Sequence, residues 1–580
     1  MNNTTKVYKP CLVDTGQGLS VLYKERFIYS KFNPIIPVEK LVHSVEIREN
    51  TLILCCSPVL GYGLKTLESR LPANCFVLVI EADFNLFSLF DMDSIPKGFG
   101  LIGPSTIQST VKLFETKNSI TENGVIVPPL GTFRRCIRLD LSGGAKLNDN
   151  TYSAINHNFD KIIANFWKNR MTLVQLGRLY HRNLFKNTWK IPFTKEFQPY
   201  SVQKTIVVLG AGTSVDDFID SLSQTKQEFR KNIFIIAVDV ALEAMLLRGI
   251  YPDIVIAQES QFAIQAAYAN ARSKKIHIYA DLASRPSVLY NQTNQPNSNG
   301  LCNCTGGPIS FFYTKFANTS LFKTLQELNI MPEQIIPLGS VGVTATEIAL
   351  KLRKNKDIPV FVSGLDFSFP AGRTHAKGSM QQTHNLSRQN RLNPIGSPAA
   401  AFAETAQKTE ASCGFYTDYK LKQYCNIFAS KYSGVPNLFK ISNKGIPLGI
   451  PTITETDFFQ TILTTSNALD SDNNNCVDRI KDIKLTKKRI EQGKRFYIQE
   501  EKKLIQLKEW LTNGGASQED LFSMLQKLEY LYVHFPDGYE PSTEIQFLKR
   551  VRAEIDFFLK DIRLALKKLN KTEKQYEGNI

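Results

Sequence analysis

Six short apolar segments between residues 205 and 363 constrain the fold of this chain more than any other feature. They are four to six residues long, rich in β-branched side chains, and lie at 205–209, 233–238, 254–257, 276–280, 335–338 and 360–363. Continuous apolarity over so short a run is typical of strands buried on both faces. Because stretches with helical spacing separate the segments, the pattern predicts an α/β fold with a doubly wound parallel sheet.

The length of 580 residues is too great for a single core. At about 100–200 residues per domain, three to four domains are expected. We predict an N-terminal Rossmann-like domain over residues 1–160 and a helical connector over 161–198. A central sheet domain then covers 199–455, and an α-helical C-terminal domain covers 456–580, after a linker composition at 466–475.

The N-terminal region contains one half of a nucleotide-binding βαβ unit. A buried-type strand at 51–56 leads to a glycine turn at 60–63, then to a helix, a strand at 76–80 and Glu81. This order is that of a dinucleotide fold, but Thr66 stands where the third fingerprint glycine is expected. A cofactor site and a purely structural domain both remain open.

Composition excludes several classes of protein. Lys and Arg number 70 against 54 Asp and Glu, a net charge of +16 that favours anionic partners. No nucleic-acid-binding motif is present, no apolar run approaches about 18 residues, and residues 1–16 do not resemble a signal peptide. The ten cysteines are sparse and irregularly spaced. These features predict a cytoplasmic protein with free cysteines, no metal site, no membrane span and no nucleic-acid partner.

Polar residues and glycines follow the central strands where each strand ends. Ligands of open parallel sheets bind in the crevice beyond these carboxyl ends. The residues concerned are Gly210, Gly212, Thr213, Ser214, Asp239, Glu259, Gly339, Ser340, Gly364 and Asp366. Together, these residues predict a nucleotide-binding site. The absence of GxxxxGK[ST], GxSxG and HExxH disfavours a P-loop kinase, an α/β-hydrolase and a zinc protease.

Three consecutive blocks then resemble a known family. LGSVGVTATE at 338–347, PVFVSGLDFSF at 359–369 and GRTHAKG at 372–378 are similar to the central domain of the motility accessory factor (Maf) flagellin glycosyltransferases. Residues 210–214, 237–239 and 249–253 fit the same pattern in order. Together with the weaker likeness of the N-terminal glycine turn, the resemblance covers roughly residues 45–85 and 200–380. Glu259 stands where the family often has Asp, and Thr213 where it often has Pro.

The resemblance implies a sialyltransferase-like, metal-independent enzyme without a cofactor. It implies transfer of a nonulosonic acid of pseudaminic or legionaminic type from a CMP-activated donor to Ser or Thr of flagellin. CMP-nonulosonic acid and flagellin are the expected partners. The identity of the sugar, the modified residues and the oligomeric state remain open.

Roles for single residues follow from the expected chemistry. We expect the 210–214 loop to bind the CMP moiety, Gly339 and Ser340 to close its other side, and Asp239 to contact ribose or base. His375 is the candidate general base, because histidine titrates near neutral pH, although a hydrogen bond that structures the loop is an alternative role. Asp366 orients His375 or replaces it as the base.

The remaining candidates are weaker. Arg373 is expected to pair with the donor carboxylate, an exposed arginine being the alternative. Thr305 and Gly306 form either a second glycine turn at the rim of the crevice or a plain loop closure. His384 is the second candidate histidine, on a polar stretch.

Two other functions compete with the glycosyltransferase. A pterin diphosphokinase family shares this kind of central domain and would use ATP and Mg²⁺. A flagellin-binding chaperone with an inactive nucleotide fold would not be an enzyme at all.

Overall fold

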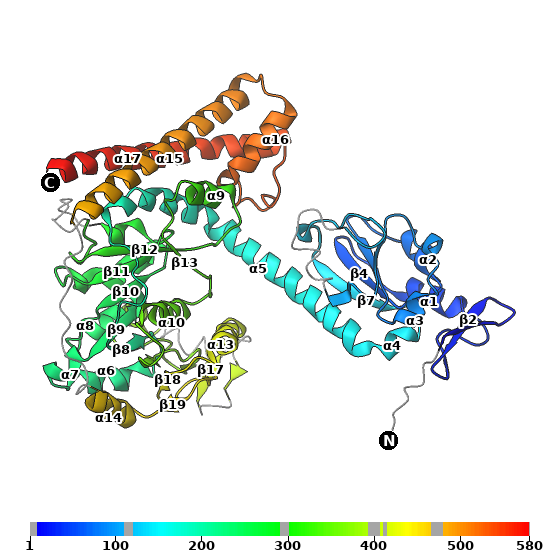
Figure 1. Cartoon of the computed structure of the whole chain (residues 1–580), viewed down its shortest axis with the longest axis horizontal. Coiled ribbons are helices and arrows are strands. Elements are labelled where there is room, and N and C mark those ends of the chain that lie inside the picture. Colours follow the sequence, from blue (N-terminus) through cyan, green and yellow to red (C-terminus); the bar gives the residue numbers. More distant parts are fainter. Residues whose placement is uncertain are drawn as a thin grey trace. The chain divides into compact units, whose positions relative to one another are not determined.

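The computed structural model describes residues 9–108, 120–290, 301–392, 407–409, 414–465 and 479–578. The chain divides into two compact units, Met1–Gln175 and Leu176–Ile580 (Figure 1). Each unit contains a parallel sheet with helices, so the predicted multidomain α/β class is confirmed. The predicted linker at 466–475 lies outside the described residues, and the boundaries at 160, 198 and 455 stay predictions.

The first unit is built on a four-stranded parallel sheet in the order β6-β5-β4-β7. The strands are β4 (Thr51–Cys56), β5 (Phe76–Ile80), β6 (Gly100–Ile102) and β7 (Arg135–Asp140). The predicted strands at 51–56 and 76–80 are β4 and β5, with α2 (Leu64–Glu68) between them. A small antiparallel sheet of β1 (Cys11–Asp14), β2 (Leu19–Tyr23) and β3 (Arg26–Phe27) precedes this sheet, followed by α1 (Ile36–Ser44).

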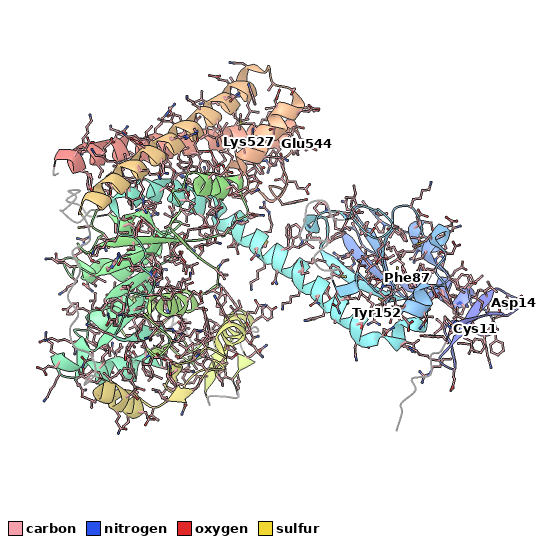
Figure 2. The ribbon with its side chains drawn as sticks, viewed as in Figure 1. Cys11, Asp14, Phe87, Tyr152, Lys527 and Glu544 are labelled. Carbon is pink, nitrogen blue, oxygen red and sulfur yellow. The ribbon has the colours of Figure 1, made fainter. Side chains whose placement is uncertain are left out.

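Protein groups fill the carboxyl edge of this first sheet. The fully buried Glu81 accepts hydrogen bonds from Ser57 Oγ at 2.7 Å, from the Asp83 backbone N–H at 2.9 Å and from Tyr152 Oη at 3.2 Å. Tyr152, labelled in Figure 2, comes from the long helix α5 (Asp149–Thr188). Burial raises the pKa of Glu81. An acid held by three donors inside the protein favours the structural role for this domain over a cofactor site.

The second unit contains a nine-stranded parallel sheet in the order β13-β12-β11-β10-β9-β8-β14-β18-β19. The strands are β8 (Thr205–Leu209), β9 (Ile233–Val238), β10 (Ile254–Ala257), β11 (His277–Asp281), β12 (Ile309–Thr314), β13 (Glu333–Ile335), β14 (Val360–Ser363), β18 (Leu438–Ile441) and β19 (Thr452–Ile453). The sequence patterns did not predict β12, β18 or β19. Strands β8 to β13 extend the sheet in one direction, and β14, β18 and β19 extend it in the other.

Helices cover both faces of this sheet. On one face lie α6 (Val215–Ser223), α8 (Leu242–Leu246) and α9 (Ser320–Glu327); on the other lie α10 (Val341–Leu352) and α13 (Tyr419–Tyr432). The apolar positions of α6 recur at helical spacing (Val215, Phe218, Ile219 and Leu222), and all four are buried. The order of strands reverses between β8 and β14, which places the crevice of this doubly wound sheet at their carboxyl ends.

The C-terminal helices α15 (Arg479–Asn513), α16 (Gln518–Lys527) and α17 (Ile545–Gly578) share the core of the first of these faces. α15 and α17 lie side by side (Figure 1), and Tyr497 Oη of α15 donates a 2.7 Å hydrogen bond to the Phe185 carbonyl of α5. Across the described parts of the chain, no helix combines the length and the apolar character needed to cross a bilayer.

A buried histidine in α5 predicts sensitivity of the second unit to acid. His181 is fully buried with Nδ1 2.7 Å from the Gly177 carbonyl oxygen, and burial lowers its pKa from 6.5 to about 4. The unfolded chain therefore binds a proton on this residue below pH 6.5, while the folded chain binds it only near pH 4. The contribution of His181 to the free energy of unfolding is fully present above pH 6.5. It decreases by about 3 kcal/mol as the pH falls to 4.

Urea unfolding of the second unit between pH 7 and pH 4 measures this effect. The variant His181→Gln should show a shallower fall in unfolding free energy over the same range. The control His384→Gln, which changes an exposed histidine, should keep the wild-type slope. Equal slopes in wild type and His181→Gln contradict the prediction.

Candidate functional site

Two loops meet where the strand order of the large sheet reverses. The loop after β8 contains Gly210 and Gly212, and the loop after β14 contains Gly364. The Gly212 N–H donates to the Gly364 carbonyl at 2.8 Å, and the Gly210 N–H donates to the Ser363 carbonyl at 2.8 Å. The two loops therefore form one backbone-bonded layer above the carboxyl ends of β8 and β14.

Close contact between the loops explains the glycines. A Cβ atom on Gly210 would lie 2.3 Å from the Gly364 carbonyl oxygen, and one on Gly212 would lie 2.6 Å from Asp366 Oδ2. Both positions thus require the absence of a side chain. The backbone of Gly364 has φ +72°, which is the left-handed region that glycine favours.

Asp366 occupies the N-terminus of α6. Its Oδ2 accepts a 2.8 Å hydrogen bond from the Ser214 backbone N–H, and its Oδ1 accepts one from Ser214 Oγ. Burial raises the pKa of Asp366. A carboxylate therefore satisfies the helix terminus at which the sequence predicted a phosphate. The other glycine-led helix of the site, α10, begins after Ser340, whose side chain makes no capping hydrogen bond.

His375 lies on the loop that follows β15 (Phe369–Pro370). The Ala376 N–H donates to the Ala211 carbonyl at 2.9 Å, which fixes this loop on the β8 loop. A small pocket is lined by residues 372–375 together with Gln382, Asn385 and Leu386 of α11 (Met380–Ser387). The structure therefore brings His375, Asp366 and the residues of the 210–214 loop into one region.

The surroundings of His375 suit a proton acceptor. Burial lowers its pKa, so the ring is neutral at pH 7. Its Nδ1 lies 3.0 Å from Thr374 Oγ1. In the tautomer that donates Nδ1–H to Thr374, the lone pair of Nε2 is free to take a proton from a ligand hydroxyl.

Arg373 is engaged within the protein. Its guanidinium lies 2.5 Å from the buried Asp216 Oδ2, while Asp216 Oδ1 accepts a 2.9 Å hydrogen bond from the Lys377 N–H and lies 3.5 Å from Arg248. Asp216 thus holds the 372–377 loop against α6. Arg373 therefore has a structural ion pair within the protein, and its predicted pairing with the donor carboxylate stays a prediction.

Asp239 and Glu259 lie at the carboxyl ends of β9 and β10. Asp239 Oδ1 accepts a 2.9 Å hydrogen bond from the Val240 N–H, and burial raises its pKa to about 7. Glu259 Oε1 accepts from the N–H groups of Ser260 at 2.8 Å and Gln261 at 3.0 Å. Both carboxyl groups thus accept backbone hydrogen bonds at the carboxyl edge of the sheet.

Buried polar atoms without partners gather along this same edge. Among the described residues, the following atoms at or just beyond the carboxyl ends of β8, β9, β10, β11 and β14 have no hydrogen-bond partner: Thr213 Oγ1, Asp239 Oδ2, Gln258 Oε1, Ser260 Oγ, Ser284 Oγ and Ser363 Oγ. More than nine-tenths of buried polar groups in proteins are hydrogen-bonded. This edge is therefore where a polar ligand or an ordered water would complete the missing hydrogen bonds. Sequence reasoning missed Ser260, Ser284 and Ser363, since serine is an ordinary residue at strand ends.

The remaining predicted residues divide between the two edges of the sheet. Gly339 has φ +77° and its Cα faces the ring of Tyr424, so that a Cβ would lie 2.5 Å from that ring. Leu365 packs beside Gly342 in the first turn of α10, which places Ser340 near the 364–366 loop.

Thr305 and Gly306 lie elsewhere. They precede β12, and Thr305 Oγ1 donates a 2.9 Å hydrogen bond to the Ile276 carbonyl just before β11. Since β11 and β12 are parallel, this turn is at the amino edge of the sheet, opposite the crevice. The predicted position at the crevice rim is therefore wrong, because the unrecognised strand β12 begins after the turn. Within the described ranges, no cluster of three or more His, Cys, Asp or Glu side chains is arranged to hold a metal ion.

Comparisons with known proteins agree with this architecture. Residues 179–372 match the family model described as 6-hydroxymethylpterin diphosphokinase MptE-like. A protein of Treponema pallidum (strain Nichols) described as uncharacterized is 30% identical over 566 residues, which are 95% of this chain and 94% of that protein. The structure of the MAf glycosyltransferase from Magnetospirillum magneticum AMB-1 aligns with a TM-score of 0.53 at 12% identity, over 98% of this chain and 91% of that one.

Proposed function

We propose that this protein transfers a sugar from a nucleotide donor to a protein hydroxyl. The chain belongs to the same family as the Treponema pallidum protein, and it has the fold of a MAf glycosyltransferase. The proposed donor is a CMP-activated nonulosonic acid, and the proposed acceptor is Ser or Thr of flagellin. The donor and acceptor follow from the motif resemblance at 338–347, 359–369 and 372–378.

The row of unpartnered polar atoms at the carboxyl edge of the large sheet carries this proposal. A ligand that spans the ends of several strands and offers many hydrogen-bonding groups matches this row, and a nucleotide sugar is such a ligand. We assign the phosphate to the N-terminus of α10 beside Gly339 and Ser340, because Asp366 already fills that of α6. Asp239, with one free oxygen, is assigned to the ribose or base.

In the proposed reaction, negative charge develops on the leaving CMP and positive charge on the sugar. The bond from the anomeric carbon to the CMP oxygen breaks, its electron pair leaves with CMP, and the sugar carries oxocarbenium-like charge. The acceptor oxygen forms the new bond to the anomeric carbon and gives its proton to His375. Asp366 fixes the loops that position His375 rather than acting as the base, because both of its oxygens accept hydrogen bonds from Ser214.

The match over residues 179–372 supports a second candidate, an ATP-dependent pterin diphosphokinase. The two functions differ in the nucleotide that they bind. For the glycosyltransferase we expect CMP to raise the melting temperature of the full chain and EDTA to leave that effect unchanged. Stabilisation by ATP with Mg²⁺, but not by CMP, would contradict the glycosyltransferase and favour the diphosphokinase.

A further inference from the structure

A buried lysine with no acidic partner lies at the carboxyl edge of the large sheet. Lys190 lies two residues after the end of α5 and is 3% exposed. Its Nζ donates to Asn187 Oδ1 at 3.1 Å and to the Pro286 carbonyl at 3.4 Å, and none of the ion pairs between described residues includes it. Lysine is almost never fully buried unless a counter-charge accompanies it.

A second lysine, Lys568, lies near the same ring and also lacks an acidic partner among the described residues. Lys568 of α17 lies with its Nζ 5.1 Å from the centroid of the Tyr290 ring and 5.9 Å from that of Trp189, and the Lys190 Nζ is also 5.9 Å from the Trp189 ring. Neither lysine forms an ion pair with a described carboxylate. Burial, together with the charge of Lys568, lowers the pKa of Lys190 to about 7. The Nζ atoms of two lysines thus lie near one ring, and neither has a carboxylate counter-ion among the described residues.

The pair lies on the same sheet edge as the proposed donor site. Asn187 Nδ2 donates to the carbonyls of Leu282 and Ser284 at 2.9 Å each, which holds the end of α5 against the end of β11. Ser284 is fully buried, and its hydroxyl has no partner among the described residues. The Arg285 N–H donates to the Glu259 carbonyl at 2.9 Å, which joins this segment to the end of β10.

We infer that Lys190 and Lys568 form the subsite that binds the carboxylate of the acidic sugar donor, with the Ser284 hydroxyl as a further donor of a hydrogen bond. A carboxylate bound by these lysines would supply the missing counter-charge and would give the Ser284 hydroxyl an acceptor. Arg373, the residue that the sequence favoured for this role, is already paired with Asp216. This inference rests on the proposed function, but it does not depend on how the CMP moiety of the donor is bound.

Calorimetric titration of the full chain with three ligands tests the inference. The ligands are CMP, CMP-N-acetylneuraminic acid and the carboxyl methyl ester of that sugar nucleotide. Wild type should bind the acid at least about 10-fold more tightly than the ester, because a charged hydrogen bond is lost in the ester. Lys190→Met and Lys568→Met should bind acid and ester equally and should bind CMP as wild type does. Lys567→Met, which changes the exposed neighbour on α17, is the matched control and should keep the preference.

Thermal unfolding separates a binding role from a structural one. A buried charge kept for binding destabilises the fold, so Lys190→Met should have an unchanged or higher melting temperature. If that variant does not fold, the half-buried Lys568 decides the question through Lys568→Met.

Different failures remain distinguishable. An undiminished preference for the acid in both lysine variants overturns the inference and leaves the proposed function in place. If wild type binds no CMP, the proposed function fails. A third outcome is that wild type binds acid and ester equally, while inorganic phosphate raises the melting temperature of wild type but not that of Lys190→Met. In that case the lysines bind a free anion, and the assignment to the donor carboxylate is wrong.

Discussion

Replacing His375 with Ala is expected to lower the rate of sugar transfer by about 10²–10⁴-fold, the usual contribution of a general base. The neutral ring of His375, held beside the 210–214 loop, is the group that we assign to accept the proton of the flagellin hydroxyl. The affinity for CMP should not change, because the imidazole is assigned to the acceptor and not to the nucleotide. Steady-state kinetics with purified flagellin measures the rate, and calorimetry measures the affinity.

The matched control is His384→Ala, which removes an exposed histidine of α11. It should leave both the rate and the affinity at the wild-type level. A transfer rate that His375→Ala does not change, with normal folding of the variant, would remove His375 from the mechanism.

The pH dependence of transfer follows from the same residue. Burial lowers the pKa of His375 below its ordinary value of 6.5, so the base form dominates at pH 7. Transfer should therefore be independent of pH around neutrality and should fall only when the pH drops below about 6.5. A pH–rate profile measures this, and a fall that begins above pH 7 would indicate a different base.

Gly210→Ala is expected to destabilise the second unit by about 3 kcal/mol or more and to abolish the binding of CMP. The new Cβ would lie 2.3 Å from the Gly364 carbonyl oxygen and 2.7 Å from its carbon, so the backbones of two loops must separate. That separation also breaks the 2.8 Å hydrogen bond from the Gly212 N–H to the Gly364 carbonyl. Urea unfolding and CMP titration report the two effects.

Gly434→Ala provides the control for the loss of a glycine. No atom lies within 4 Å of the position of its Cβ, and its φ is not in the left-handed region. This variant should unfold and bind as wild type does. Wild-type stability of Gly210→Ala would show that the two loops are not held together as described.

In the large sheet, the longer apolar runs predicted strands well, whereas the run at 335–338 overlaps β13 only at Ile335 and the more polar strands were missed. β8, β9, β10 and β14 begin and end where the apolar runs do. β12 (ISFFYT) mixes serine and threonine with aromatic residues, and β18 (LFKI) carries Lys440, so neither resembles a continuous apolar run. Lys440 is nevertheless buried, because its Nζ donates to the carbonyls of Lys444 at 2.7 Å and Ile446 at 3.1 Å.

The candidate site, too, was predicted only in part from the sequence. The rule that ligands lie beyond the carboxyl ends of strands led to Asp239, Glu259 and the 364–366 loop, which follow β9, β10 and β14 in the structure, while their roles stay predictions. The rule did not show that Asp366 reaches across 152 positions of the chain to Ser214 and fills the N-terminus of α6. Lys190 was also missed, because it follows a segment whose spacing predicts only a connecting helix, and its neighbours Pro286 and Lys568 come from distant parts of the chain.

The intact mass of flagellin tests the central claim most directly. Flagellin is produced together with this protein and with the enzymes that make a CMP-activated nonulosonic acid, and its mass is determined by mass spectrometry. The account predicts an added mass of one or more nonulosonic acid residues with the wild-type protein and little or none with His375→Ala or Asp366→Asn. Unmodified flagellin in the presence of the wild-type protein, or the same added mass with both variants, would contradict the account and favour a flagellin-binding chaperone.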